Sequence, residues 1–168
     1  RPTIIETILG SCVAVCLHDP VAKIGGMNHI LLPGKADMKR FDAVARYGIN
    51  AMELLINKMV STGACRSRLV AKTFGGAHIL SSISPQNGTG QKNIEFVVDF
   101  LTLESISIAG YSMGGRDTRR IYFHTDTGEV LLKRIPSSNF KEITTHENRV
   151  LDRVQSKVVR SGDIVLFK

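Results

Sequence analysis

The chain has 168 residues, 43% of them hydrophobic, which is enough to bury the core of one domain and fits one domain better than two. No apolar stretch approaches the roughly 20 residues that cross a bilayer, and the first residues do not resemble a signal peptide, so we expect a cytoplasmic protein without membrane insertion. The formal charge of +7 favours an acidic partner, but the lack of Trp and of basic runs interleaved with Phe or Tyr argues against nucleic acid.

The first predicted elements form a β-hairpin. Small and β-branched residues over Cys12–His18 indicate a strand, Asp19–Ala22 is typical of a turn, and Lys23–Leu32 returns to an extended apolar pattern. A four-residue loop at Asp19–Ala22 pairs His18 with Lys23, and every other pair of the hairpin follows from this register.

This register places Cys12 opposite His29. Directly opposed residues of an antiparallel pair have Cβ atoms about 4.5 to 5.5 Å apart, close enough for a thiol and an imidazole to share a proton. A thiolate is a strong nucleophile, and a nearby imidazole both accepts the thiol proton and stabilises the charge. Gly10 and the peptide N–H groups after it are candidates for an oxyanion hole. The alternative is that Cys12 is a small core residue and His29 a hydrogen-bonded strand histidine, and composition alone favours this alternative.

The three cysteines are an odd number and too sparse for a disulfide framework, which is typical of a reducing compartment. We expect Cys16 and Cys65 to be core residues. A metal site at Cys12 and Cys16 would need further ligands at a suitable spacing, and the sequence offers none. We therefore expect neither a metal nor another cofactor.

The middle of the chain alternates between helical and extended patterns. Apolar residues at the spacing of one helical face predict a helix over Phe41–Val60. A strand is predicted over Ser67–Phe74, leading into Gly75–Gly76 and then into a loop rich in Ser, Gly and Asn over Ser81–Gln91. Asn93 is the predicted cap of a second helix that ends at Leu103.

The last third of the chain predicts a series of strands followed by a polar tail. The predicted strands are Ile106–Ala109, Arg119–Thr125 and Glu129–Arg134, the last two joined by a turn at Asp126–Gly128. Beyond Pro136 we expect a helix near Asn148–Val159 and a final apolar piece at Ile164–Phe167. Helices inserted among hairpins indicate a single α+β domain, layered as an α/β sandwich with mixed and antiparallel strands.

A serine hydrolase is an alternative function. The segment Gly110–Gly114 matches the G-x-S-x-G pattern with Ser112 as nucleophile, and Asp126 and His146 follow in the order that an α/β-hydrolase uses. The pattern requires a strand, a sharp turn and then a helix, whereas the chain runs on into Ile121–Phe123, which is typical of a hairpin strand. We therefore expect Ser112 not to be a nucleophile.

Several motifs together resemble the CheD family, the chemoreceptor glutamine deamidases of bacterial chemotaxis. The two most specific motifs are the segments Leu9–Cys16 and Gly25–Pro33, with Asp19–Pro20 between them. The resemblance continues through Lys72–Ala77, Gly90–Asn93, Gly114–Gly115 and Thr127–Gly128. It covers most of the chain to about Arg134, which leaves residues 135–168 as a divergent C-terminal tail of one domain spanning residues 1–168.

The resemblance implies a catalytic cysteine at Cys12, a catalytic histidine at His29 and a fold similar to that of bacterial toxin deamidases. A third site residue of the family is a threonine upstream of the cysteine. We assign it to Thr7, five positions before Cys12, although the family spacing of about six falls on Glu6. Thr3 is a weaker candidate for the same role.

The resemblance also implies a substrate and a partner. The substrate is a glutamine side chain of a methyl-accepting chemoreceptor, converted to glutamate, with hydrolysis of glutamyl methyl esters as a secondary activity. The partner is a CheC-type phosphatase, and a non-catalytic role as the binding partner of that phosphatase is an alternative. Ser112 and Lys92 depart from the residues usual in the family, which bears on substrate contacts.

Five basic residues near the predicted last hairpin are candidates for a receptor-facing patch. They are Arg116, Arg119, Arg120, Lys133 and Arg134. A solvated strand face is the simpler interpretation and the one we expect.

Overall fold

The computed structural model describes residues 2–78 and 88–135. In chain order, these residues form β1 (Ile4–Leu9), β2 (Val13–Asp19), β3 (Ile24–Ile30), α1 (Ala43–Ser61), a 3₁₀ helix η1 (Arg66–Arg68), β4 (Val70–Gly75), α2 (Thr89–Leu103), β5 (Ser107–Met113), β6 (Thr118–His124) and β7 (Val130–Ile135). This order confirms the predicted α+β class with mixed and antiparallel strands. The predicted likeness to toxin deamidases stays a prediction.

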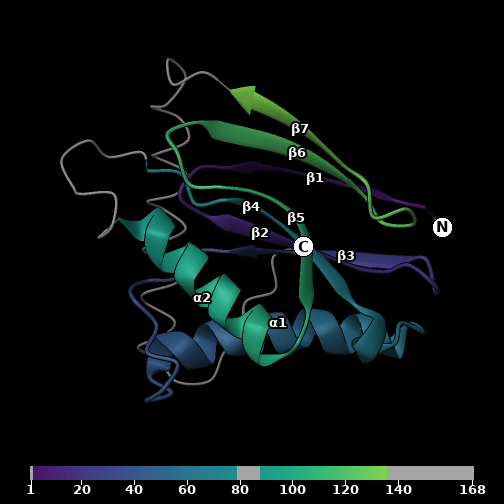
Figure 1. Ribbon diagram of the computed structural model, residues 1–168, viewed down its shortest axis with the longest axis horizontal. Coiled ribbons are helices and arrows are strands. Elements are labelled where there is room, and N and C mark those ends of the chain that lie inside the picture. Colours follow the sequence, from purple (N-terminus) through teal and green to yellow (C-terminus); the bar gives the residue numbers. More distant parts are fainter. Residues whose placement is uncertain (1, 79–87, 136–168) are drawn as a thin grey trace.

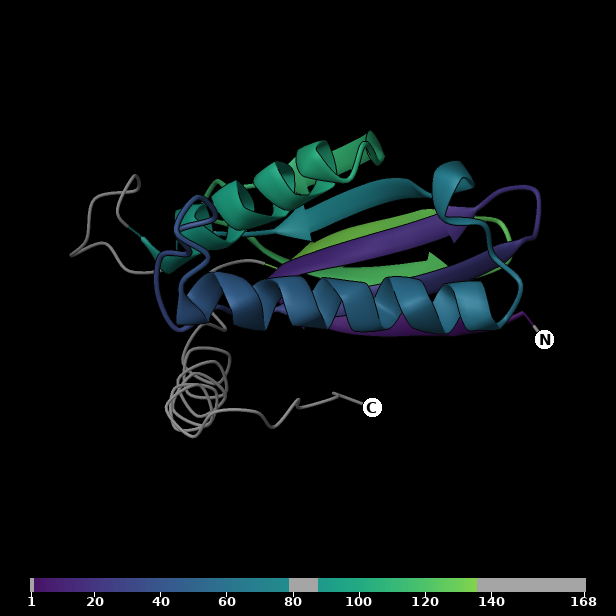
Figure 2. The same cartoon turned by 90° about the horizontal axis from the view of Figure 1, so that it is seen from below.

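The elements stack in three layers (Figure 1). The outer sheet has the strand order β1-β6-β7 and is antiparallel, and the central sheet has the order β3-β2-β4-β5. Within the central sheet β4 and β5 are parallel, because α2 provides the crossover connection that parallel strands need. Figure 2 shows α1 and α2 side by side over the face of the central sheet that points away from the outer sheet.

Strand β2 is buried along its whole length because it lies in the middle layer. Val13, Val15 and Leu17 belong to the core between the central sheet and the helices. Ala14 and Cys16 belong to the second core, between the two sheets. A strand covered on both faces shows a continuous apolar run rather than an alternating one, as this segment does.

Strand β1 was not predicted from the sequence. Its side chains alternate, with Ile5 and Leu9 packed into the core between the sheets and Ile4 and Ile8 exposed. It pairs with β6, more than a hundred residues later, with Thr7 opposite Ile121. The strand therefore depends on a distant partner.

The two helices confirm the predicted helical pattern but not all of its boundaries. In α1 the carboxylate of Asp42 accepts a hydrogen bond from the Ala45 backbone N–H at 2.7 Å, which caps the helix one residue before its first turn. Gly48 of α1 lies against the ring of Phe96 in α2, where a Cβ would come within 2.4 Å of the ring. Glycine at this position lets the two helices touch.

Several predicted boundaries were wrong, and the strand predicted from Ser67 begins only at Val70, after η1. Helix α2 begins at Thr89 with Gly88 as its N-cap, so Asn93 does not cap the helix but lies inside it, and the predicted loop cannot extend to Gln91. The strand predicted at Ile106–Ala109 continues to Met113 as β5. The predicted elements beyond residue 135, and the loop residues 81–87, lie outside the described residues.

No helix in the described ranges is long and apolar enough to cross a membrane.

Candidate active site

Cys12 lies where the chain passes from the outer sheet to the central sheet. The turn Gly10–Cys12 connects the end of β1 to the start of β2. Cys12 is 4% exposed and packs with Leu9 and Phe74 in the core between the sheets. The residue that carries the candidate thiol is therefore held between two rigid elements.

The predicted register of the hairpin was wrong by two residues. Val13 pairs with Ile30 and Ala14 with His29, because Asp19 belongs to β2 and the turn begins after it. A shift of two keeps every side chain on its original face, since side chains alternate with a period of two. Cys12 and His29 therefore lie on the same face of the hairpin, as diagonal neighbours rather than opposed ones.

Thr7 contacts the imidazole of His29. The Oγ1 atom of Thr7 lies 3.0 Å from Nδ1 of His29, so the outer sheet touches the hairpin of the central sheet at this point. If Nδ1 carries the ring proton, the Thr7 hydroxyl accepts it and the lone pair lies on Nε2. This arrangement orients the ring and selects its tautomer.

The two other candidates for the third residue lie elsewhere. Glu6, at the spacing usual in the family, points to the opposite face of β1 and forms an ion pair with Arg120 at 3.0 Å. Thr3 lies before β1, where its backbone is hydrogen bonded to the Thr125 hydroxyl. Of these three residues, Thr7 is the one whose side chain lies within hydrogen-bond distance of the His29 ring.

The end of β4 encloses the turn that carries Cys12. The Gly76 N–H donates to the Cys12 carbonyl at 2.7 Å, and the Ala77 N–H donates to the Gly10 carbonyl at 2.7 Å. Gly75 has a φ of +108°, and a Cβ at this residue would lie 2.1 Å from the Cys12 carbonyl oxygen. Glycine is therefore required at Gly75, where the backbone of β4 comes close to the backbone of the Cys12 turn.

Asn93 of α2 reaches the same turn from the other side. It is fully buried, its Oδ1 accepts a hydrogen bond from the Leu32 N–H at 2.8 Å, and its Nδ2 donates to the Ser11 carbonyl at 2.9 Å. The role predicted for Asn93 was only that of a helix cap. Asn93 is a polar residue on a helical face that is otherwise apolar, and this pattern was the sequence signal that its side chain is buried and hydrogen bonded.

The interpretation of the basic residues as a solvated strand face was wrong for Arg119. Its side chain is buried, donates to the Gly114 carbonyl at 2.6 Å and the Ser112 hydroxyl at 3.1 Å, and lies 3.5 Å from the Gly75 carbonyl. Burial lowers the pKa of this guanidinium, and the charge of Arg134 lowers it further. Arg119 faces inward because it pairs with Leu9, an inward-facing residue of β1.

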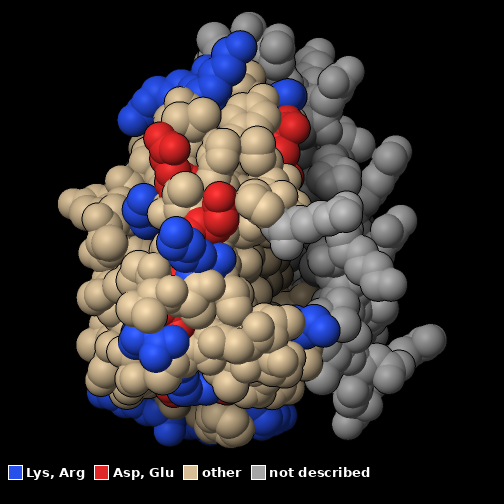
Figure 3. Space-filling model, turned by 90° about the vertical axis from the view of Figure 1, so that its right-hand side faces the viewer, with Lys and Arg blue, Asp and Glu red and all other residues tan. Residues whose placement is uncertain are grey.

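The other four basic residues are exposed or half-buried. On the face shown in Figure 3, basic side chains lie at several separate places with acidic ones between them.

Ser112 lacks the surroundings of a hydrolase nucleophile. It lies within β5, and the chain continues through Gly114–Gly115 into β6 rather than into a helix. Its hydroxyl also accepts the hydrogen bond from Arg119. The strand–turn–helix context of the serine alternative is therefore not present at Ser112, as expected.

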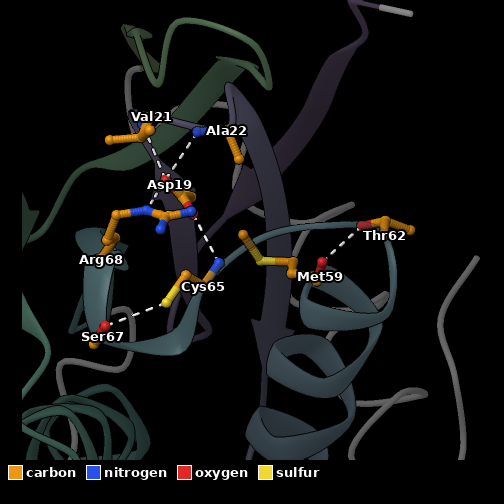
Figure 4. Close-up of polar contacts among 8 residues, drawn as sticks. All are labelled: Asp19, Val21, Ala22, Met59, Thr62, Cys65, Ser67 and Arg68. Carbon is orange, nitrogen blue, oxygen red and sulfur yellow. Dashed lines mark hydrogen bonds and ion pairs between the residues drawn. The ribbon is translucent and has the colours of Figure 1, made fainter.

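The remaining cysteines differ from each other. Cys16 is buried, and burial raises the pKa of its thiol to about 12, so it is a core residue as predicted. The prediction was wrong for Cys65, which is only half-buried and has its sulfur 3.2 Å from the Ser67 hydroxyl (Figure 4). That hydrogen bond lowers the pKa of the Cys65 thiol.

An ion pair between buried Asp19 and half-exposed Arg68 lies at the far end of β2 from Cys12. The Asp19 side chain has no exposed surface and binds the Arg68 guanidinium at 2.8 Å (Figure 4). The same carboxylate accepts hydrogen bonds from the N–H groups of Val21, Ala22 and Cys65. It therefore joins the β2–β3 turn to the segment around η1.

A pocket of about 740 Å³ lies at this far end of the hairpin. It is lined by residues including Pro2, Lys23, Gly25 and Thr125, and neither Cys12 nor His29 contributes to it. Among the described residues, no three His, Cys, Asp or Glu side chains are grouped so that they could hold a metal ion.

Comparison with known proteins identifies the family. The family described as CheD chemotactic sensory transduction matches residues 31–134. A protein of Stenotrophomonas maltophilia (strain K279a) named "Probable chemoreceptor glutamine deamidase CheD" is 47% identical over 99% of this chain and 82% of its own length. A protein of the same name from Xanthomonas campestris pv. campestris (strain B100) is 45% identical over 99% of this chain and 82% of its own length. A Shewanella oneidensis protein named "Probable chemoreceptor glutamine deamidase CheD 1" is 42% identical over 98% of this chain and 80% of its own length. The chain belongs to the CheD family.

Proposed function

We propose that this chain is a cytoplasmic cysteine hydrolase that deamidates glutamine side chains of methyl-accepting chemoreceptors in chemotaxis. The relatives, which are named as probable chemoreceptor glutamine deamidases, support the reaction and the substrate. The observation that carries the mechanism is the 3.0 Å contact between Thr7 and His29 on the face of the hairpin that also bears Cys12. A nucleophile, a base and a group that orients the base are the parts that covalent amide hydrolysis requires.

In the first step the Cys12 thiolate attacks the side-chain amide carbon of a receptor glutamine. The sulfur forms a bond to this carbon, and the imidazolium of His29 gives its proton to the departing nitrogen, which leaves as ammonia. Thr7 holds the ring so that Nε2 faces the reacting groups. The product of this step is a thioester between Cys12 and the receptor side chain.

In the second step water hydrolyses the thioester. His29 removes a proton from the water, the oxygen attacks the thioester carbon, and the bond to sulfur breaks. One glutamine and one water thereby become one glutamate and one ammonia, and the Cys12 thiolate is restored. A glutamyl methyl ester fits the same steps with methanol as the leaving group.

The low exposure of Cys12 suits a slender substrate group. With 4% of its surface exposed, Cys12 is reached by an extended side chain more easily than by a folded backbone. Glutamine presents its amide at the end of such a side chain. The formal charge of +7 favours approach to the acidic adaptation region of a receptor, and binding to a CheC-type phosphatase is proposed alongside catalysis.

The test uses purified receptor fragments and mass spectrometry. Wild-type protein should convert specific glutamines to glutamate and release ammonia, whereas Cys12→Ala should lose both activities by at least about a thousandfold because the nucleophile is gone. Cys65→Ala is the matched control and should retain full activity, since Cys65 lies beside Asp19, at the end of β2 opposite to Cys12. Conversion by Cys12→Ala at the wild-type rate would disprove the mechanism.

A further inference from the structure

One buried polar side chain connects the two segments that carry Cys12 and His29. Asn93 lies on the face of α2 that bears Phe96, Val97 and Phe100, all of them core residues. Burying an amide among such residues is unfavourable unless both of its ends are hydrogen bonded. Both ends of the Asn93 amide are hydrogen bonded.

The two bonds go to backbone groups next to the candidate pair. Nδ2 donates to the carbonyl of Ser11, the residue directly before Cys12, at 2.9 Å. Oδ1 accepts from the N–H of Leu32, three residues after His29, at 2.8 Å. One planar amide thus fixes the distance between the segment before β2 and the segment after β3. Both segments lie beyond the last β2–β3 pair, Val13 with Ile30.

The turn before β2 has donors on each of its three carbonyls. Ala77 and Gly76 provide backbone N–H groups for the carbonyls of Gly10 and Cys12, both from the end of β4. The middle carbonyl, that of Ser11, receives its bond from the Asn93 side chain. Because that donor is a side chain, a single substitution removes it without changing the backbone that encloses the turn.

We infer that Asn93 is a positioning residue, which holds the Cys12 turn and the His29 strand in register so that the thiol and the imidazole share a proton. This inference rests on the proposed function of Cys12 and His29. Asn93 itself acts through the backbone of Ser11 and Leu32 and does not contact the reacting atoms. Its loss should therefore reduce turnover rather than receptor binding.

The test measures the reactivity of the Cys12 thiol directly. In a Cys65→Ser background, the rate of Cys12 alkylation by iodoacetamide is followed from pH 5 to 9 by peptide mass spectrometry, since only the thiolate reacts. Asn93→Ala should move the midpoint toward the value of an ordinary thiol and slow alkylation at pH 7 by about tenfold or more. For receptor deamidation, kcat should fall by about tenfold to a hundredfold while KM changes by less than about threefold.

Val97→Ala is the matched control. Val97 lies one turn further along α2, is equally buried and packs only in the core, so its truncation destabilises the helix without removing a polar contact. Thermal unfolding places the two variants on one stability scale. Val97→Ala should keep the wild-type alkylation profile and kcat.

Asn93→Asp keeps an acceptor for the Leu32 N–H but, once ionised, places an oxygen against the Ser11 carbonyl, and it serves as the second variant if Asn93→Ala does not fold. An alkylation profile and a kcat that match those of Val97→Ala overturn the inference. If Asn93→Ala changes the thiol reactivity but the wild-type protein releases no ammonia from receptors, the proposed function is refuted and the inference stands.

Discussion

At the scale of single residues, the contact between Thr7 and His29 shows how strand alternation selects a site residue. Glu6 and Thr7 are adjacent, yet one points to solvent and the other into the space between the sheets. The spacing usual in the family favoured position 6, but only the residues that share the inward face with Leu9 can reach His29. Thr7 has that orientation.

Thr7→Val tests the orienting role of the hydroxyl. Valine keeps the size and branching of threonine but cannot accept the Nδ1 proton, so the ring loses its fixed tautomer. We expect kcat for receptor deamidation to fall by about tenfold to a hundredfold, with little change in the melting temperature. Thr7→Ser keeps the hydroxyl and should retain most of the activity, so an equal loss in both variants would show that the hydroxyl is not required.

At the scale of elements, the end of β4 limits what can stand beside the turn of Cys12. Gly75 is the last β4 residue paired with β2, opposite Val13, and a Cβ on Gly75 would collide with the Cys12 carbonyl oxygen. The same short segment contributes the Gly76 N–H to the Cys12 carbonyl. The order of the turn therefore depends on β4, a strand about sixty residues later in the sequence.

Gly75→Ala should disrupt this element. The added Cβ would lie 2.1 Å from the Cys12 carbonyl oxygen, and the φ of +108° is unfavourable for alanine, so we expect a loss of roughly 3 kcal/mol or more in the free energy of unfolding. Gly110→Ala on the neighbouring β5 is the control, because its Cβ would meet only the Lys72 side chain at 3.7 Å. Chemical denaturation of both proteins measures the difference, and equal stabilities would contradict the close approach.

Much of the element order could be predicted from the sequence, since periodicity is a local property. The hairpin of β2 and β3, helix α1 and the hairpin of β6 and β7 each showed their pattern within a short window. The register of the first hairpin was wrong because Asp19, a residue typical of turns, ends β2 and binds the turn with its side chain. The shared face of Cys12 and His29 survived this error because the shift was even.

The rest of the site could not be predicted because it depends on contacts between distant segments. Thr7 reaches His29 only because β1 pairs with β6 in a separate sheet, and no local pattern indicates that pairing. The burial of Arg119 and the bonds of Asn93 likewise depend on which element packs against them. The class of fold followed from local patterns, whereas the division into two sheets did not.

At the scale of the whole molecule, the two ends of β2 have different roles. The Cys12 end carries the candidate site, and the Asp19 end carries an ion pair that ties the hairpin to the segment around η1. The hydrogen bonds from Arg68 hold the pKa of the Asp19 carboxyl well below its usual range. This ion pair therefore contributes to the stability of the whole fold.

The low pKa of Asp19 predicts an acid-sensitive melting temperature. A carboxyl whose pKa is lowered by folding contributes its full stabilisation above the unfolded value of about 3.9, and loses it as the pH falls toward the folded value. We expect the melting temperature to decrease below about pH 4, and Asp19→Asn to be less stable at pH 7 but less sensitive to pH in the acid range. Asp99→Asn, an exposed change on α2, is the control and should follow the wild-type curve in circular dichroism.

The placement of Thr7 in one sheet and His29 in the other has a mechanical consequence. Their contact crosses the interface between the two layers, which Leu9, Ile121 and Phe123 fill with apolar side chains. A ligand that separated the two layers would therefore lengthen this contact. The NMR chemical shifts of the His29 imidazole should therefore report on the distance between the two sheets.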